Sequence, residues 1–135
     1  MITTLSLRNF KAFKHLERLE LKDLTILVGR NSCGKSSIIH SLLLLKQTLE
    51  SESENDLCIE GRYLKFSSLK EISHGSPSAN RANIEYDFGV AKDGDHENPA
   101  QVRIAFKNDK RCGVYVPAIS HYSVSYTHLT LPTKA

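Results

Sequence analysis

A glycine-rich turn near the N-terminus limits most strongly what this chain can fold into. Residues 29–36 read GRNSCGKS, which fits the pattern G-x-x-x-x-G-K-[ST] without a mismatch. The apolar run at 24–28 before it predicts a strand buried on both faces. Residues 35–49 after it predict a helix with a broad apolar face. A strand, this turn and a helix, in that order, are the context that a phosphate-binding P-loop requires.

The residue types in the turn suit phosphate chemistry. Gly29 and Gly34 let the backbone curl so that successive N–H groups point into one concavity, and the start of the helix adds its positive end. Lys35 is expected to reach the β- and γ-phosphates and is the candidate catalytic residue, while the Ser36 hydroxyl is expected to ligate Mg²⁺. A glycine-rich turn without a ligand is the alternative interpretation. The candidate nucleotide-binding residues in this segment are Gly29, Arg30, Asn31, Ser32, Cys33, Gly34, Lys35, Ser36 and Ser37.

Composition places the chain among single globular domains. It has 135 residues, of which 40% are hydrophobic and 24% charged, so collagen-like, low-complexity and wholly disordered classes are excluded. The longest apolar run, at 42–45, is far shorter than the roughly 20 residues of a membrane span. The N-terminus lacks the features of a secretory signal, and the three cysteines form no Cys-x-x-Cys pair. We therefore expect a cytoplasmic protein with reduced thiols and no membrane partner.

The net charge of +3 is distributed unevenly. Residues 1–48 carry eight Lys or Arg against three Asp or Glu, whereas the remainder carries ten against twelve. An anionic ligand is therefore more plausible in the N-terminal part. The basic residues Lys11, Lys14, Arg18 and Lys22 form a candidate contact with a phosphate backbone, and a solvated strand edge is the simpler alternative.

Hydrophobic patterning predicts an α/β P-loop fold that carries an antiparallel β-lobe. Residues 2–10 alternate as a strand, 16–21 are a shorter strand candidate, and 68–71 carry the capping-box pattern of a short helix. The second half of the chain predicts a β-meander with little helix. Its expected strands and hairpins fall at residues 57–66, 83–90, 101–106 and 113–116.

Two motifs together resemble a known family. The P-loop at 29–36 is preceded by LRNFKAF at residues 7–13, and this pair looks like the N-terminal half of an ABC-type ATPase head. The resemblance is greatest to the SMC, RecF and OLD-nuclease group, often described as AAA-family ATPases, and it is strong over residues 1–50. It implies ATP and Mg²⁺ as ligands and adds Lys11 as a candidate nucleotide contact. An exposed lysine at a strand end is the alternative for Lys11.

The same resemblance implies a function and partners. ATPases of this group clamp nucleotide between two heads, so a homodimer of heads is expected, and many act on DNA in repair, chromosome maintenance or phage defence, some with a nuclease partner. The acidic and signature segments needed for hydrolysis are missing from this sequence, since the nearest acidic candidate, at 83–88, alternates like a half-exposed strand. Gln47 follows the P-loop too closely to be the water-sensing glutamine of this family. A nucleotide-sensing module without significant turnover is therefore the alternative function.

The C-terminal residues look foreign to the protein. Val124 to Thr133 read VSYTHLTLPT, which matches the translation of a transposase-derived sequencing adapter residue by residue. A genuine Thr-rich β segment is the alternative. We therefore expect residues 1–123 to be the N-terminal part of an ATPase head, with 1–50 as strand, P-loop and helix and 51–123 as a β-rich lobe. Residues 124–135 are then a non-native tail, and the chain as given is expected to be inactive alone.

Overall fold

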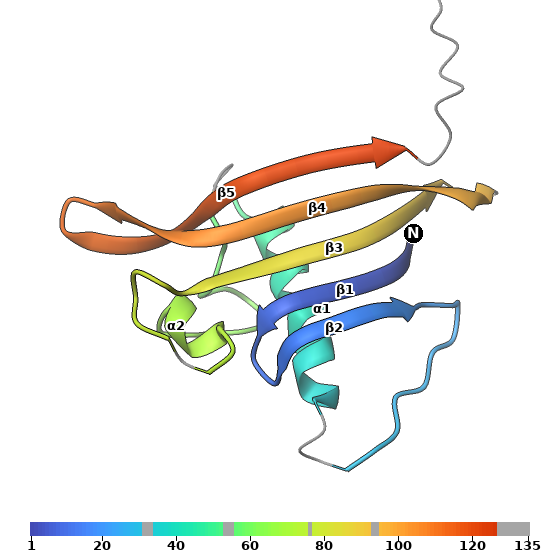
Figure 1. Ribbon diagram of the computed structural model, residues 1–135, viewed down its shortest axis with the longest axis horizontal. Coiled ribbons are helices and arrows are strands. Elements are labelled where there is room, and N and C mark those ends of the chain that lie inside the picture. The colour runs from blue at the N-terminus through green and yellow to red at the C-terminus, as the bar shows by residue number, and fades with distance from the viewer. Residues whose placement is uncertain (31–33, 53–55, 76, 93–94, 127–135) are drawn as a thin grey trace, which may run out of the picture.

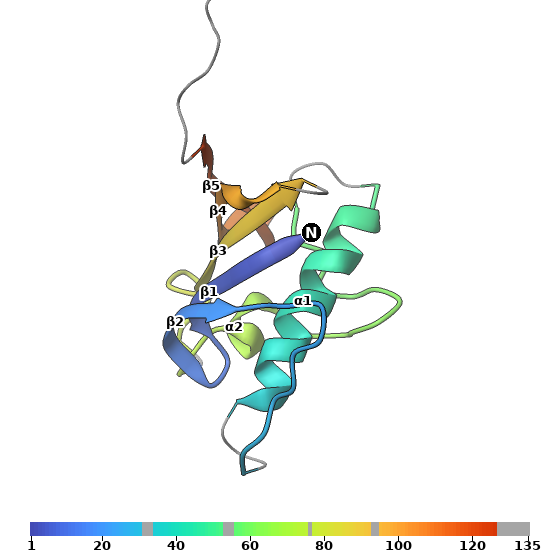
Figure 2. The same cartoon turned by 90° about the vertical axis from the view of Figure 1, so that its right-hand side faces the viewer.

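A five-stranded antiparallel sheet covered on one face by a single long helix forms the body of the protein (Figures 1 and 2). The computed structural model describes residues 1–30, 34–52, 56–75, 77–92 and 95–126. In space the strands follow the order β2-β1-β3-β4-β5. The elements are β1 (Ile2–Phe10), β2 (Phe13–Glu20), α1 (Lys35–Glu50), α2 (Leu69–Ile72), β3 (Asn83–Lys92), β4 (Asp95–Arg111) and β5 (Val114–Tyr126).

Alternation along the central strands explains the two faces of the sheet. Leu5 and Leu7 of β1 and Tyr86 of β3 are fully buried on the helix side. Residues that alternate with these along the strands point to the other face of the sheet. There Asp87 of β3 and Arg103 of β4 form an ion pair of 3.0 Å. This is the period-2 pattern of a sheet that has one face on the core and one in water.

The helix α1 is fastened to the sheet by apolar packing and by one buried hydrogen bond. Leu44 and Leu45 lie in the core cluster. The Tyr86 hydroxyl, which is fully buried on β3, donates to the backbone carbonyl oxygen of Ser41 at 2.7 Å. Burial raises the pKa of this phenol, so it stays protonated and remains a donor. In the described part of the chain, no helix is long and apolar enough to cross a membrane.

Residues 57–66 form a hairpin-like loop that the Gln47 side chain holds against α1. The Gln47 Oε1 accepts from the backbone N–H groups of Tyr63 and Leu64, and its Nε2 donates to the carbonyl oxygen of Cys58. Gln47 is 3% exposed, so these bonds satisfy a buried amide. The glutamine therefore has a structural role, which agrees with excluding it as a water-sensing residue.

The prediction of a buried strand at 24–28 is wrong. This segment lies outside every strand, and Leu24, Ile26 and Val28 are 79%, 74% and 85% exposed. Figures 1 and 2 show it running away from the sheet between β2 and the start of α1. Only its alternate residues Thr25 and Leu27 turn toward α1, where they border a hollow of about 360 Å³. A strand buried on both faces needs neighbouring strands, and in the described residues none pairs with it.

Most other expected elements are present, with different bounds. β1 and α1 match their predicted ranges within one residue, and the antiparallel β-rich second half is confirmed. β4 and β5 are longer than predicted, and they pair with each other from Ala100↔Tyr126 to Arg111↔Val114. The capping box at α2 is displaced by one residue: Glu71 accepts from the backbone N–H and hydroxyl of Ser67, while the Ser68 side chain caps nothing in the described structure. The α/β class is therefore confirmed only in part, since one antiparallel sheet and few helices are present.

Candidate functional site

The two described ends of the predicted P-loop are glycines with positive φ. Gly29 has φ 151° and Gly34 has φ 91°, so both occupy backbone conformations that side chains disfavour. The Lys35 Nζ donates to the carbonyl oxygen of Gly29 at 2.5 Å and thereby joins the two ends of the turn. Asn31, Ser32 and Cys33, predicted to lie in the turn, are outside the described residues.

The start of α1 offers donors to an anion. Gly34 is the N-cap, no side chain caps the described helix terminus, and no acidic residue stands in the first turn. The first backbone hydrogen bond within the helix runs from Ile38 N to Gly34 O at 3.1 Å, so the N–H groups of residues 35–37 precede the helical ladder. Ser36 is exposed beside them, and Ser37 is buried. This donor set fits phosphate oxygens, and the Ser36 hydroxyl is accessible to a cation held by those phosphates.

The β1–β2 hairpin packs against this same end of α1. Phe10 and Phe13 are cross-strand partners, and Lys11 lies in the turn between them with φ 47°. The Lys11 Nζ is 2.9 Å from His40 Nδ1 on α1 and 4.6 Å from the centre of the Phe66 ring. Thus the structure places the Lys11 side chain against the second turn of α1, where it contacts His40 and Phe66.

The backbone of the hairpin turn is held from its other side by α2 and the residues after it. Lys11 N donates to Ile72 O at 2.7 Å, and His74 N donates to Asn9 O at 2.8 Å. The His74 ring nitrogen Nδ1 lies 2.8 Å from Lys11 O, and since a carbonyl oxygen only accepts, this nitrogen must carry the proton. These three contacts fix the position of the turn relative to α1.

Burial shifts the protonation equilibria of the Lys11–His40 pair. Desolvation lowers the pKa of Lys11, and the Glu71 carboxylate partly opposes that shift. Desolvation, and then the Lys11 charge, lower the pKa of His40. A neutral His40 that accepts a hydrogen bond from the Lys11 ammonium is consistent with both directions.

Other acidic and basic residues considered from the sequence lie elsewhere. Glu85 and Asp87 point to the helix-free face of the sheet and pair with Arg103 at 3.5 and 3.0 Å. They are therefore separated from the P-loop by the sheet itself. In the described residues, no group of three or more His, Cys, Asp or Glu side chains could hold a metal ion. Lys14, Arg18 and Lys22 are exposed along β2 and just after it.

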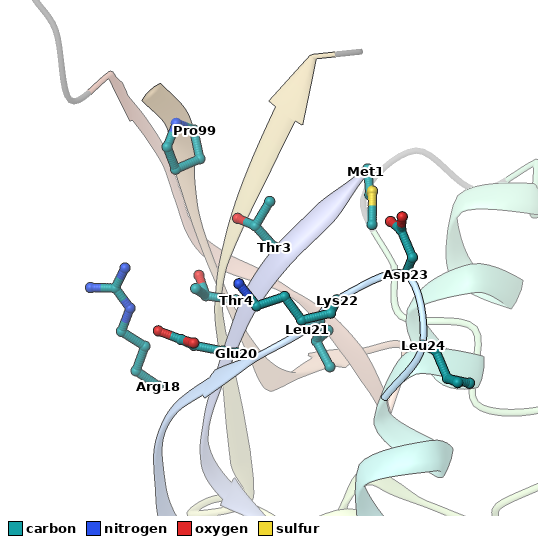
Figure 3. Close-up of a pocket in the computed structure, with 10 residues that line it drawn as sticks. All are labelled: Met1, Thr3, Thr4, Arg18, Glu20, Leu21, Lys22, Asp23, Leu24 and Pro99. Carbon is teal, nitrogen blue, oxygen red and sulfur yellow. The ribbon is translucent and has the colours of Figure 1, made fainter. Parts of the chain in front are cut away.

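A hollow of about 510 Å³ lies away from the P-loop, at the opposite end of β1 and β2 (Figure 3). Figure 3 shows that its lining mixes charges of both signs, including Arg18, Glu20, Lys22 and Asp23. The hollow is open to solvent, and its lining mixes these charges with apolar side chains such as Met1 and Leu24, so it presents no single ligand chemistry. The predicted P-loop, whose groups suit one ligand chemistry, is therefore the better candidate site.

Sequence reasoning missed the roles of two residues: Phe13, which contacts Gly34, and His74, which holds the β1–β2 turn at Lys11. Phe13 lies against Gly34, since a β-carbon added at Gly34 would come within 2.5 Å of the ring atom Cζ of Phe13. Aromatic residues at 10 and 13, on either side of a two-residue turn, are visible in the sequence as a hairpin signal. The contact with Gly34 depends on how the hairpin docks, and that is not legible from spacing.

A model of the AAA ATPase domain matches residues 1–121 of the chain. No curated protein matches it. The matched residues contain the P-loop ends, the β1–β2 hairpin, both helices and most of the sheet. The chain therefore belongs to the AAA ATPase domain family.

Proposed function

We propose that this chain is the nucleotide-binding front part of an ABC-type ATPase head of the SMC, RecF and OLD group. Membership of the AAA ATPase domain family supports ATP binding and hydrolysis in general. The observation that carries the proposal is the uncapped N-terminus of α1, where Lys35 and Ser36 follow the left-handed Gly34. It joins backbone donors, a cationic side chain and a hydroxyl in one place.

The residues of the site would divide the work as follows. Backbone N–H groups of the turn, from Gly29 to Ser37, hold the phosphate oxygens. Lys35, which donates to the Gly29 carbonyl oxygen in this structure, would place its charge on the β- and γ-phosphates and would be the catalytic residue of this segment. Ser36 would hold Mg²⁺, whose charge neutralises the phosphates during transfer. Lys11 would contact the nucleotide after release from His40.

The wider role of the protein follows from the resemblance. We place residues 1–123 in the ATPase head and treat 124–135 as a tail derived from a sequencing adapter. Support for this division comes from the family match, which covers residues 1–121. Val124–Tyr126 extend β5 opposite Ala100–Val102, but that pairing uses backbone groups, which most sequences offer. A cycle in DNA repair, chromosome maintenance or phage defence, with two heads closing on nucleotide, is the corresponding process.

A titration with Mg·ATP tests the site assignment. Lys35→Ala is expected to weaken binding by about tenfold to a hundredfold, since hydrogen bonds to charged groups contribute about 1.5–3 kcal/mol and 1.4 kcal/mol is about tenfold. Lys46→Ala is the matched control, because Lys46 is an exposed lysine on the same helix whose Nζ lies over the Tyr63 ring at 4.9 Å. Equal affinity in the Lys35→Ala variant and the wild type would refute the assignment.

Resequencing of the gene across codon 123 tests the proposed division of the chain. If the adapter reading is right, adapter-trimmed DNA continues into an apolar strand ending in Asp-Glu and a signature segment, as a hydrolysing head requires. A frame that continues through residues 124–135 would contradict it. In that case a small nucleotide-sensing module without significant turnover becomes the better account.

A further inference from the structure

We propose that Phe13 is a positioning residue for the P-loop, which it controls by pressing its ring against Gly34. This inference rests on the proposed nucleotide site and adds to it a residue outside the motif. A β-carbon on Gly34 would stand 2.5, 2.9 and 3.2 Å from three atoms of the Phe13 ring. Carbon atoms in ordinary contact are about 3.5–4.0 Å apart, so the ring leaves space at Gly34 for a hydrogen atom alone.

Gly34 is the joint between the loop and the helix. It is the N-cap of α1 and has φ 91° and ψ 9°, and its carbonyl oxygen accepts the first hydrogen bond of the helix. The direction of the donors at Lys35 and Ser36 therefore depends on the two dihedral angles of this residue. Glycine rotates freely between positive and negative φ, so without an external constraint the joint has more than one conformation available. The Phe13 ring supplies that constraint.

Phe13 can act in this way because its own position is fixed. Its cross-strand partner Phe10 is fully buried and meets Tyr86 edge to face, with ring centroids 6.0 Å apart. The turn between the two phenylalanines is anchored by Lys11, through its backbone to Ile72 and through its side chain to His40. The ring at position 13 is thus mounted on a hairpin that is attached to both the core and α1.

The hairpin consequently contacts α1 at two points. Phe13 meets Gly34, and Lys11 meets His40 six residues further along, which is about 9 Å at the helical rise of about 1.5 Å per residue. A movement of the hairpin relative to α1 would shift both contacts together. The orientation of the phosphate donors is therefore coupled to the docking of β1 and β2 on the helix.

Removal and partial restoration of the ring test the positioning role. Phe13→Ala is expected to weaken Mg·ATP binding by about tenfold, with Phe13→Leu recovering most of the loss. The matched control is Phe88→Ala, which removes a buried phenylalanine of β3. Phe88 pairs with Leu5, five residues along β1 from Phe10, or about 16 Å at about 3.3 Å per residue. This control is expected to lower the thermal midpoint while leaving affinity within about twofold. An unchanged affinity in Phe13→Ala would overturn the proposal.

A double-mutant cycle between Phe13 and Gly34 gives a second test. It measures the coupling free energy of this one pair, which would be zero if Phe13 stabilised the protein only through other contacts. Gly34→Ala in the wild type suffers both the positive φ and the collision with the ring. In the Phe13→Ala background only the cost of the positive φ remains, so there Gly34→Ala should raise the unfolding equilibrium constant about tenfold less than it does in the wild type. The effects of Gly34→Ala in the wild type and in Phe88→Ala should be equal. Equal effects in the wild type and in Phe13→Ala would overturn the proposal.

The binding experiment and the unfolding cycle together distinguish failure of this inference from failure of the proposed function. The cycle on unfolding equilibria needs no nucleotide, and it can be run in the 135-residue chain or in the longer reading frame if resequencing extends it. A wild type that binds no Mg·ATP would refute the nucleotide site, whereas the unfolding cycle would still report whether Phe13 constrains Gly34. Normal binding by the wild type together with absent coupling would refute the positioning role alone.

Discussion

At the scale of single residues, Lys11 of the β1–β2 turn contacts both α1 and the segment that contains α2. The backbone of Lys11 is bonded to residues of and after α2, and its side chain reaches His40 of α1. Its φ of 47° is uncommon for a residue with a side chain, which indicates that these contacts hold it there. The family resemblance implied Lys11 as a candidate nucleotide contact, and in the structure its side chain is engaged with His40.

The Lys11–His40 contact predicts acid sensitivity. Burial and the Lys11 charge lower the pKa of folded His40 below its ordinary 6.5, so the unfolded chain takes up the proton first as pH falls. Stability from this source is complete above about pH 6.5 and declines as pH falls through that value toward the folded pKa. Phe66 and Glu71 also face the pair, and Glu71 acts on the Lys11 charge.

Denaturation midpoints between pH 7.5 and 5 measure this effect. His40→Gln keeps an acceptor for Lys11 and removes the titration, so its midpoint is expected to fall less than that of the wild type over this interval. Parallel pH profiles for the two proteins would rule out His40 as the titrating group.

The Tyr86 hydroxyl provides a second prediction at this scale. Tyr86→Phe removes the hydrogen bond to Ser41 O and keeps the ring that packs between Phe10 and Phe106. We expect a loss of about 0.5–1.5 kcal/mol in the free energy of unfolding, measured by urea denaturation. A loss above about 3 kcal/mol would mean that the ring packing also changes, contrary to this account.

At the scale of elements, the segment at 24–28 is where sequence and structure differ most. Its composition is that of a buried strand, yet burial on both faces depends on neighbouring strands, which no local pattern specifies. The strands β1 and β3 were predictable because alternation within each strand encodes its own core face. The P-loop pattern lies within one short segment of the sequence and stays a prediction, whereas the contact of Phe13 with Gly34 arises from two elements that meet in space.

Two neighbouring lysine substitutions test the orientation of this segment in the 135-residue chain. Ile26→Lys replaces a residue that is 74% exposed and should change the free energy of unfolding by no more than about 0.5 kcal/mol. Leu27→Lys replaces a residue packed against the core cluster and should destabilise by more than about 2 kcal/mol, because a charge enters an apolar contact. Urea denaturation of both variants shows which side of the segment faces the core and which faces solvent. The reverse order of effects would refute the described orientation.

At the scale of the whole molecule, a small core is accompanied by many large apolar side chains that are exposed. Leu24, Ile26 and Val28 are exposed on one side of α1, and Ile39 and Leu49 are exposed on α1 itself. Large apolar side chains that are this exposed gain free energy when another surface buries them. The edge strand β5 adds a long row of backbone groups beside exposed residues such as Tyr122.

This surface predicts that the 135-residue chain self-associates in solution. Sedimentation velocity across a range of protein concentrations should give an apparent mass above that of the 15.2 kDa monomer and rising with concentration. The double variant Ile26→Lys/Val28→Lys should shift the distribution toward monomer, since it places two charges on the exposed apolar segment. Asn80→Lys, at an exposed loop position, controls for added charge and should leave association unchanged. A concentration-independent monomer with a well-dispersed NMR spectrum would show that the exposed apolar residues do not drive association, and the core described here would then be sufficient by itself.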